Sequence, residues 1–348
     1  MTSQSRVLFV AGDPGGAAAL LPVITTWTGP KTVLVYRQAA KIYRDAGLEI
    51  QELGEGAPSL QAAAEWIKST QAAMVVGATS VNGIDWECYF FQAAAGCSVP
   101  SLAVLDYWSN YSPRFTLAQP LDALPDLIAV MDERARQEML AAGFPGDRLR
   151  ITGQPVLDEA RRWRAGIRKD HRQQFREQLQ LPPEATAFLY VSQPLREMRA
   201  TTGTVTTDED EFAALIRLSQ AMQELADPRM VLLIKLHPRE PSDKYDAILG
   251  ELPFQARIVN PALHRWEVCL AADQVWSISS MLLEEARAMG CRVGMLRTGE
   301  PVHLLPSGHA DEPDARMEMP LATALIRQLI DQLLASPAPA SDGQPDSQ

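Results

Sequence analysis

A lysine and a histidine end an apolar run in the second half of the chain. The run begins at Val231 and stops at Lys235, His237 and Pro238. A run this short, with polar boundaries, is typical of a strand buried on both faces of a parallel sheet. Because ligands of open α/β sheets bind beyond the carboxyl ends of the strands, Lys235 and His237 are candidates for contacts with an anion. The alternative is that both side chains only solvate the end of a strand.

Three serines precede a predicted helix some forty residues later. Ser277, Ser279 and Ser280 lie between a predicted strand and the helix at 281–289. Their hydroxyls and the exposed N–H groups of the helix start suit a phosphate. Simple N-capping is the alternative, and both functions can coexist. Glu284 and Glu285 follow one turn later, where a favourable interaction with the helix dipole would also explain them.

A third group of hydrogen-bond donors follows the predicted strand at 187–191. Ser192, Gln193 and Arg196 offer a hydroxyl, an amide and a guanidinium. The fork of an arginine can meet two phosphate oxygens at once, so these residues predict a diphosphate contact. An ordinary polar loop is the alternative.

The first half of the chain supplies a carboxylate in a glycine-rich turn. Asp13 follows the predicted strand at 7–11, in a position from which it could deprotonate a hydroxyl as a general base. Gly15 and Gly16 would let a substrate approach the backbone closely. Asp-Pro-Gly is also a common turn sequence, which leaves a purely structural interpretation open.

A second carboxylate, Asp106, precedes an aromatic cluster. Tyr107, Trp108 and Tyr111 could stack on a sugar or lipid, and Arg114 could contact an anion. Asp106 is then the alternative general base. The aromatic residues could equally close an interface between domains.

Strands alternate with helices along almost the whole chain. This alternation predicts parallel sheets with right-handed crossovers. We expect a first domain at 1–158, a second at 159–335 and a disordered tail at 336–348, which is rich in Pro, Ser, Asp and Gly.

Composition limits the class of protein. The 348 residues are 46% hydrophobic and 22% charged, and a net charge of −11 argues against a nucleic-acid surface. The Arg-rich stretch at 148–172 is interpreted as a solvated helix face, with contact to anionic lipid headgroups as the alternative. Four widely spaced cysteines, no signal peptide and no long apolar segment predict a cytoplasmic protein.

Several other chemistries have weak support. The turn at 12–16 lacks both GxGxxG and GK[ST], so a nicotinamide or Walker-type site is not expected. The acidic run at 208–211 is expected to begin a helix. His264, His303 and His309 lack metal-ligand spacing, and we expect neither a metal nor a cofactor.

The order of these motifs resembles that of GT-B-fold glycosyltransferases. The resemblance covers roughly residues 6–335 and rests on the segments at 12–16, 151–158, 190–197, 235–238 and 277–285. The first half is similar to the lipid A disaccharide synthase and MurG type, and the second half to bacterial capsule transferases that use cytidine nucleotides. The resemblance implies two Rossmann-like domains facing each other across a cleft, with the nucleotide on the C-terminal domain and the acceptor on the N-terminal one.

The resemblance therefore predicts a metal-independent glycosyltransferase that moves a sugar from a nucleotide-sugar donor to a hydroxyl of a glycan, lipid or small molecule. It implies that Ser192, Arg196, His237, Ser279 and Ser280 hold the donor phosphates and that Glu284 or Glu285 holds the ribose. Asp13 is the preferred base and Asp106 the second choice. A hydrolysing nucleotide-sugar 2-epimerase and a non-catalytic sugar-nucleotide-binding protein are the alternatives.

Overall fold

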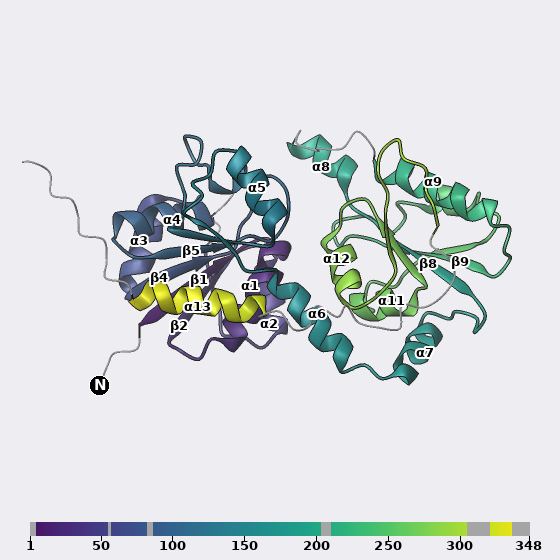
Figure 1. The fold of residues 1–348 in the computed structure, drawn as a ribbon, viewed down its shortest axis with the longest axis horizontal. Helices are drawn as coiled ribbons and strands as arrows, with labels where there is room; N and C mark the ends of the chain where they lie inside the picture. The colour runs from purple at the N-terminus through teal and green to yellow at the C-terminus, as the bar shows by residue number, and fades with distance from the viewer. Residues whose placement is uncertain (1–4, 55–56, 82–85, 203–209, 305–320, 336–348) are drawn as a thin grey trace, which may run out of the picture. The chain divides into compact units, whose positions relative to one another are not determined.

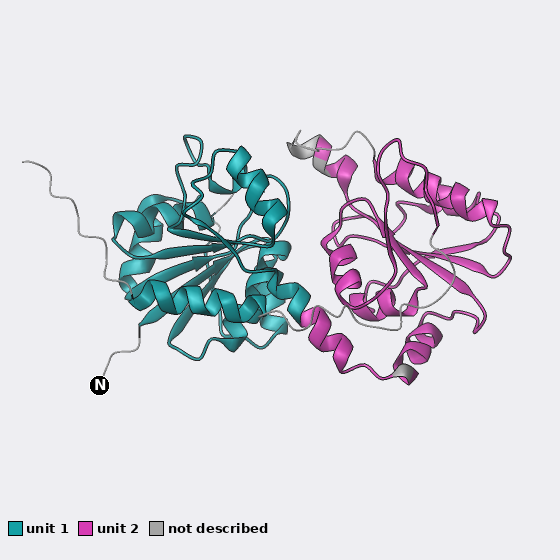
Figure 2. Cartoon of the chain, viewed as in Figure 1, with its two compact units in different colours: residues 1–158, 319–348 teal, residues 159–318 magenta. Residues whose placement is uncertain are grey.

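The chain folds into two compact α/β units. The computed structural model describes residues 5–54, 57–81, 86–202, 210–304 and 321–335. One unit combines residues 1–158 with 319–348, and the other comprises residues 159–318 (Figure 2). The predicted tail at 336–348 lies outside the described residues, as do Asp208 of the acidic run and His309.

The first unit is built on a sheet of seven strands. Their order is β3-β2-β1-β4-β5-β6-β7, and every pairing is parallel. Because both faces of the central strands are covered, β1, β4, β5 and β6 have continuous apolar runs instead of alternating patterns, whereas the edge strands β3 and β7 are partly polar and exposed. The strands are β1 (Arg6–Ala11), β2 (Lys31–Val35), β3 (Gln51–Glu52), β4 (Ala72–Gly77), β5 (Ser101–Val104), β6 (Leu127–Val130) and β7 (Leu149–Ile151).

Helices cover both faces of this sheet and enclose a hydrophobic core on each (Figure 1). Ser59 and Asp132 cap two of them, because each side chain accepts a hydrogen bond from the backbone N–H three residues later. The helices are α1 (Pro14–Thr26), α2 (Ala39–Asp45), α3 (Leu60–Ser69), α4 (Trp86–Gly96), the 3-10 helix η1 (Ser112–Phe115) and α5 (Glu133–Ala141).

The C-terminal helix α13 (Ala322–Ala335) also belongs to the first unit. Ile326 and Ile330 are fully buried in the same core as Val7 and Leu20, beside α1 (Figure 1). The sequence predicts this helix but assigns it to the second domain. Helical periodicity shows that a helix has an apolar face, but it does not show which sheet covers that face.

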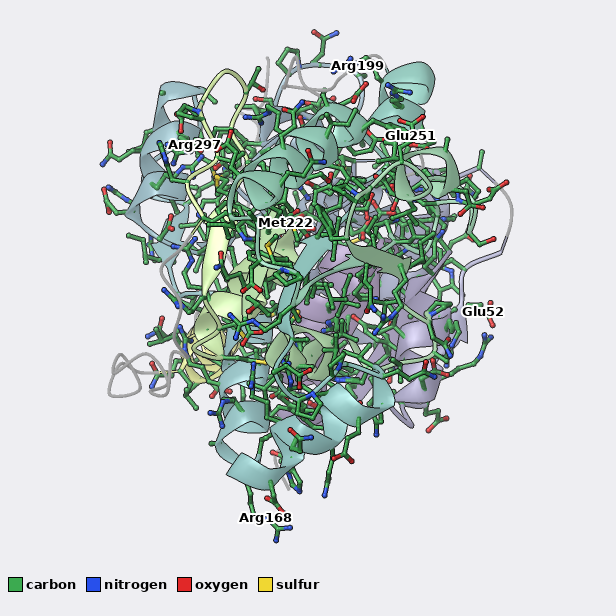
Figure 3. All side chains as sticks on the ribbon, turned by 90° about the vertical axis from the view of Figure 1, so that its right-hand side faces the viewer. Glu52, Arg168, Arg199, Met222, Glu251 and Arg297 are labelled. Atoms are coloured by element: carbon green, nitrogen blue, oxygen red, sulfur yellow. The ribbon has the colours of Figure 1, made fainter. Side chains whose placement is uncertain are left out.

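The second unit has a sheet of five parallel strands in the order β10-β9-β8-β11-β12. These strands are β8 (Thr186–Val191), β9 (Met230–Lys235), β10 (Gln255–Ile258), β11 (Gln274–Ser277) and β12 (Val293–Met295). Helix α6 (Pro155–Ala165) begins in the first unit and ends in the second. The other helices of the second unit are α7 (Lys169–Gln178), α8 (Leu195–Thr202), α9 (Glu211–Glu224), α10 (Asp246–Leu249), α11 (Arg265–Ala271) and α12 (Met281–Ala288). Met222 of α9 is fully buried, while charged side chains such as Arg168 and Glu251 are exposed (Figure 3).

Two doubly wound α/β units with parallel sheets confirm the predicted GT-B-like fold class. In each unit, strand after strand ends at the same edge of the sheet, and this edge collects most of the predicted site residues. Among the helices of the described residues, we find none with the length and apolar composition that a membrane span requires.

Candidate functional site

Asp106 is held firmly at the carboxyl edge of the first sheet. It follows β5, and its Oδ1 accepts a hydrogen bond of 3.0 Å from the Thr79 hydroxyl. Arg114, from η1, pairs with the same oxygen and is only 4% exposed. Arg114 was predicted to contact an anion of the ligand, but its guanidinium forms an ion pair with Asp106 inside the unit.

Gly15 and Gly16 are required by packing at the start of α1. A Cβ on Gly15 would overlap Oδ2 of Asp106, and one on Gly16 would lie 2.8 Å from the Cβ of Ala78. The sequence predicts these glycines for close approach of a substrate. In the structure they first allow the amino end of α1 to lie against Asp106 and the residues after β4.

Asp13 occupies the N-cap position of the same helix. Its two carboxylate oxygens lie 3.4 Å from Nη1 of Arg37 and 3.4 Å from the backbone N of Val81. Both Asp13 and Asp106 thus lie at the positive end of the α1 dipole, which favours carboxylates. Their side chains are 11% and 13% exposed, so each is largely shielded from solvent.

A second polar group near this edge is absent from the sequence-based prediction. Glu87 of α4 is 1% exposed and accepts a hydrogen bond of 3.0 Å from Ser80. The hydroxyl of Tyr36 donates to the same carboxylate, and its ring lies where a Cβ on Gly12 would be. The signal for this group was a single charged residue, Glu87, in a helix that is otherwise uncharged and mostly apolar.

The aromatic residues after Asp106 bind mainly to α5. The indole N–H of Trp108 donates to Asp132 at 2.9 Å, and the Tyr111 hydroxyl donates to Glu138 at 2.6 Å. Burial, followed by the hydrogen bond with Glu138, raises the pKa of Tyr111. Tyr107 packs edge-on against Trp108, with ring centroids 5.7 Å apart. The cluster therefore anchors the loop after β5.

In the second unit, Gln193 connects the end of β8 to the start of α12. Its amide oxygen accepts a bond of 2.9 Å from the backbone N of Ser279, and its amide nitrogen lies 3.3 Å from the Ser279 hydroxyl. Ser280 caps α12 by accepting from the N–H of Leu282 at 3.2 Å. Gln193, Ser279 and Ser280 remain half-buried, so their polar atoms stay at the sheet edge.

Two other predicted donor residues are turned inward. Ser277 is completely buried, and its hydroxyl donates to the carbonyl of Val191 at 2.8 Å. Ser192 is 2% exposed, and its hydroxyl lies 2.7 Å from Glu240 and 2.6 Å from the Tyr245 hydroxyl. These two hydroxyls already have partners within the protein.

Arg196 lies further out. Its guanidinium pairs with Asp210 at 2.7 Å and stacks over the Phe212 ring, 4.0 Å from the centroid. Asp210 is also the N-cap of α9, as the predicted helix start at the acidic run implies.

Lys235 and His237 are brought together at the end of β9. Lys235 is half-buried, and its side-chain ammonium has no hydrogen bond or ion pair with any residue that the structure describes; burial lowers its pKa. Burial and then the nearby Arg239 and Lys235 lower the pKa of His237 to about 4. Since Nδ1 of His237 accepts from the backbone N of Arg239 at 3.2 Å, its ring proton lies on Nε2, which can donate to a ligand.

The two glutamates of α12 have different surroundings. Glu285 is 5% exposed and accepts hydrogen bonds from Arg265, at 2.8 Å, and from the indole of Trp266. Glu284 pairs with Arg287 at 3.4 Å and its side chain is 28% exposed. Glu284 is therefore the more accessible of the two.

The sequence-based prediction also missed Lys244. Its ammonium lies among the carboxylates of Glu197, Glu211 and Glu240, next to Ser192 and His237. Glu240 is only four residues away from Lys244, but Glu197 and Glu211 are 47 and 33 residues away, so no local motif indicates the whole group.

The Arg-rich stretch at 148–172 is largely bound within the protein. Arg148 donates to the carbonyl of Pro125 at 2.8 Å, Arg162 pairs with Glu159, and Arg172 pairs with Asp273 at 2.9 Å. Arg162 and Arg168 are exposed, as the predicted solvated helix face requires, whereas Arg148 and Arg172 are bound to the protein. Lipid contact stays a prediction.

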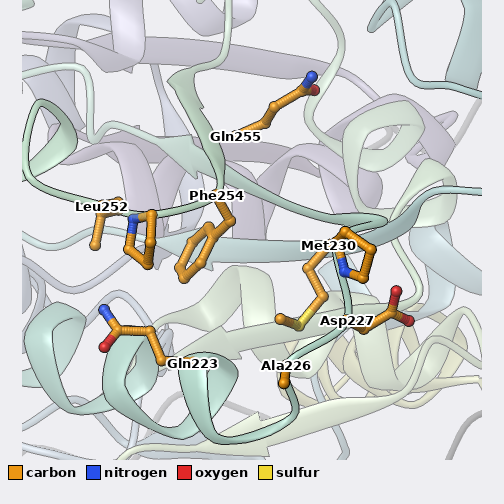
Figure 4. Close-up of a pocket in the computed structure, with 9 residues that line it drawn as sticks. Gln223, Ala226, Asp227, Met230, Leu252, Phe254 and Gln255 are labelled. Atoms are coloured by element: carbon orange, nitrogen blue, oxygen red, sulfur yellow. The ribbon is translucent and has the colours of Figure 1, made fainter.

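A surface hollow of about 700 Å³ lies elsewhere on the second unit (Figure 4). Met230 and Gln255, the first residues of β9 and β10, line it with Phe254 and the end of α9. It is thus at the amino edge of the sheet, opposite the edge that carries His237 and Ser279.

The fold was compared with known proteins. No family model and no curated protein sequence matches the chain. Among solved structures, it is similar to the UDP-GlcNAc 2-epimerase of Neisseria meningitidis bound to UDP-GlcNAc, with 15% identity over 94% of this chain and 93% of that chain and a TM-score of 0.60. The UDP-GlcNAc 2-epimerase of Methanocaldococcus jannaschii matches with 11% identity over 83% and 82% and a TM-score of 0.58. HepE of Anabaena in complex with UDP matches with 13% identity over 94% and 90% and a TM-score of 0.59.

These neighbours correct the functional prediction. The sequence predicts a glycosyltransferase, and this prediction is wrong because the neighbours named by activity are UDP-GlcNAc 2-epimerases. The alternative prediction, a hydrolysing nucleotide-sugar 2-epimerase, has the better support. The finer resemblance to lipid A disaccharide synthase and MurG stays a prediction. At 11–15% identity, the similarity establishes the fold.

Proposed function

We propose that this protein is a hydrolysing nucleotide-sugar 2-epimerase whose substrate is a UDP-linked 2-acetamido sugar. The observation that carries the proposal is the similarity to the Neisseria meningitidis epimerase, which extends over 94% of this chain and 93% of that chain. A match of this extent includes both α/β units. The UDP in the Anabaena structure further supports a uridine nucleotide as the ligand.

The reaction replaces the bond between C1 and the nucleotide with a hydroxyl and inverts C2. A base removes the C2 proton, and the nucleoside diphosphate leaves C1 with the electron pair of the C1–O bond, so a C1=C2 double bond forms. Water then adds its hydroxyl to C1, and an acid returns a proton to the other face of C2. The chemistry needs two proton transfers and stabilisation of an anionic leaving group.

Asp13 and Asp106 are our candidates for the two proton transfers. Both carboxylates lie at the amino end of α1, and both are largely shielded from solvent. Asp106 is fixed by Thr79 and Arg114, whereas Asp13 has longer contacts to Arg37 and Val81. We assign removal of the C2 proton to Asp106, because a carboxylate held by a guanidinium keeps a fixed orientation.

The second unit is proposed to bind the nucleotide. Lys235 and Nε2 of His237 would contact the diphosphate together with Gln193, Ser279 and Ser280, and they stabilise the charge that develops on the leaving group. The proposal assigns to protein donors the role that a metal ion has in other enzymes. Glu284, the more accessible glutamate of α12, is the candidate for the ribose hydroxyls.

Incubation with UDP-GlcNAc alone in deuterium oxide tests the proposal. We expect the reaction to release UDP and a free 2-acetamido sugar that has an inverted C2 and carries deuterium at this carbon. Proton NMR detects both products. An Asp106→Asn variant should reduce turnover at least about a hundredfold. Asp45→Asn, which changes an exposed aspartate paired with Lys41, is the matched control.

Two outcomes would reject an epimerase. If UDP stabilises the protein against heat but UDP-GlcNAc yields neither UDP nor exchange at C2, the chain is a non-catalytic nucleotide-sugar-binding protein. If UDP has no effect on thermal stability, the proposed nucleotide ligand is wrong.

The free thiols of all four cysteines support the further proposal of a cytoplasmic location.

A further inference from the structure

A buried lysine fills a group of carboxylates in the second unit. The Lys244 ammonium lies 2.7 Å from Glu240 and 3.0 Å from Glu197, and 2.5 Å from Glu211. The side chains of Lys244, Glu211 and Glu240 are 3%, 0% and 0% exposed. Three carboxylates thus share one ammonium, and two of the three are shielded from water.

Glu240 extends this group to two ends of strands. One of its oxygens accepts the Ser192 hydroxyl at 2.7 Å, and the other accepts the backbone N–H of His237 at 2.6 Å. Ser192 follows β8 directly, and His237 lies two residues beyond the end of β9. The carboxylate therefore ties together the two loops that also carry Gln193 and the His237 ring.

Glu211 extends the group to α8 in the same way. Its carboxylate accepts from the backbone N of Arg196 at 3.2 Å, while its own backbone carbonyl accepts the Tyr190 hydroxyl at 2.7 Å. The Lys244 group thus contacts the last part of β8, the start of α8 and the end of β9. All of these segments surround the residues proposed to bind the diphosphate.

The charge of Lys244 is what allows these carboxylates to be buried. A carboxylate that loses both water and its counter-ion is costly, so it is expected to rotate toward solvent or take up a proton. Either change would release the Ser192 hydroxyl or the His237 N–H from Glu240. The position of both loops therefore depends on a cation at this place.

We propose that Lys244 is a positioning residue for the nucleotide site, an internal cation that holds the loops after β8 and β9 in the geometry that binds a nucleoside diphosphate. This inference rests on the proposed function only in assigning the diphosphate to Gln193 and His237. Lys244 itself does not touch the nucleotide, and its effect is transmitted through Glu240.

The test compares nucleotide affinities by calorimetry. Lys244→Met keeps the length of the side chain and removes its charge, so we expect the affinity for UDP to fall at least tenfold and the affinity for UMP to fall less. Lys41→Met is the matched control, because Lys41 pairs with Asp45 on the surface, and it should bind UDP as the unmodified protein does. A folded Lys244→Met protein with UDP affinity within twofold of the unmodified protein would overturn the proposal, as would an equal loss for UDP and UMP.

Glu240→Gln tests the same idea without an uncompensated charge. Lys244 keeps two carboxylate partners, so this variant is expected to fold even where Lys244→Met does not. The glutamine amide has one acceptor oxygen where the carboxylate has two, so it loses the hydrogen bond from either the Ser192 hydroxyl or the His237 N–H. UDP affinity should therefore again fall more than UMP affinity. Unchanged UDP affinity in this variant would contradict the proposed link through Glu240.

Replacement of the lost charge by a metal ion gives a readout that does not depend on the nucleotide. The oxygens of the three glutamates all lie within 4.8 Å of one another, a spacing that a divalent cation can bridge. In Lys244→Ala, calcium should therefore raise the melting temperature and EDTA should reverse the effect, whereas the unmodified protein should not respond. No response in Lys244→Ala would show that the site does not require a cation. If the unmodified protein binds no UDP while this rescue occurs, the proposed function fails and the internal cation remains.

Discussion

Two lysines at the carboxyl edge of the second sheet have opposite surroundings. Lys244 lies among three carboxylates from α8, α9 and the loop after β9. Lys235, at the end of β9, is half-buried near Arg265 and has no paired carboxylate among the described residues. The first cation is fully compensated by the fold and the second is not.

This difference separates a cation that maintains the fold from one that is ready to bind an anion. Taking Lys244 away leaves buried negative charge, so the folded state loses stability. Taking Lys235 away relieves the cost of burying an unpaired charge, so the folded state should lose little. We expect stability and nucleotide affinity to respond differently to the two substitutions.

The largest effect is expected for the stability of Lys244→Met. Removal of one partner of a buried ion pair typically costs about 3–5 kcal/mol. Unfolding in urea, followed by circular dichroism, should show a loss of this size for the second unit. A change below about 1 kcal/mol, the range of exposed pairs, would remove the contrast between the two lysines.

Lys235→Met is expected to weaken nucleotide binding and leave stability almost unchanged. A lost hydrogen bond to a charged group is worth about 1.5–3 kcal/mol, which corresponds to roughly a ten- to hundredfold weaker UDP complex. Calorimetry with UDP measures the affinity, and urea unfolding measures the stability. A marked loss of stability with normal UDP affinity would reverse the assignment of the two lysines.

His237, next to these lysines, should make the stability of the protein depend on pH. Its pKa is lowered to about 4, below the usual value of 6.5, so the folded state prefers the neutral ring. The stabilisation from this preference is present above pH 6.5 and is lost as the pH falls from 6.5 toward 4. We expect a loss of about 2 kcal/mol over this interval, which His237→Asn should reduce. Equal pH dependence of unfolding in both proteins would contradict the shift.

The smallest effect concerns the serines near α12. Ser277→Ala removes a buried hydroxyl that donates to Val191, so we expect about 1 kcal/mol lower stability and unchanged UDP affinity. Ser279→Ala should lower UDP affinity because Ser279 is half-buried at the sheet edge. Equal UDP affinities of the two variants would show that accessibility does not distinguish these serines.

The alternation of apolar runs and amphipathic segments was enough to predict the fold. Short runs such as Phe188–Val191 and Val231–Ile234 have no polar face, which only a sheet covered on both sides explains. The same signal could not place α13, because its apolar stripe fits either sheet. Helix α13 packs beside α1 because its apolar side chains complete the hydrophobic core on that face of the first sheet.

The candidate site was predictable where a residue stands at the end of a strand. Asp106, Gln193, His237 and Ser279 all follow strands, and the parallel topology brings those of each unit to one edge. Glu87, Glu240 and Lys244 were not predictable in this way. Ser192 meets Glu240 from 48 residues away, and Tyr36 meets Glu87 from 51, so no local spacing records either contact.

The sequence by itself thus determined the two α/β units and the residues at the ends of their strands, because period and run length are local properties of the chain. Only the tertiary structure decided which of those residues are free to meet a ligand. Ser192, Ser277 and Arg114 carry polar groups suited to anions, yet each is bound by the protein itself. Lys235 and Lys244 have the same side chain, and only folding surrounds one of them with carboxylates. Compensation of charge is a property of neighbours in space, and the order of residues along the chain does not contain it.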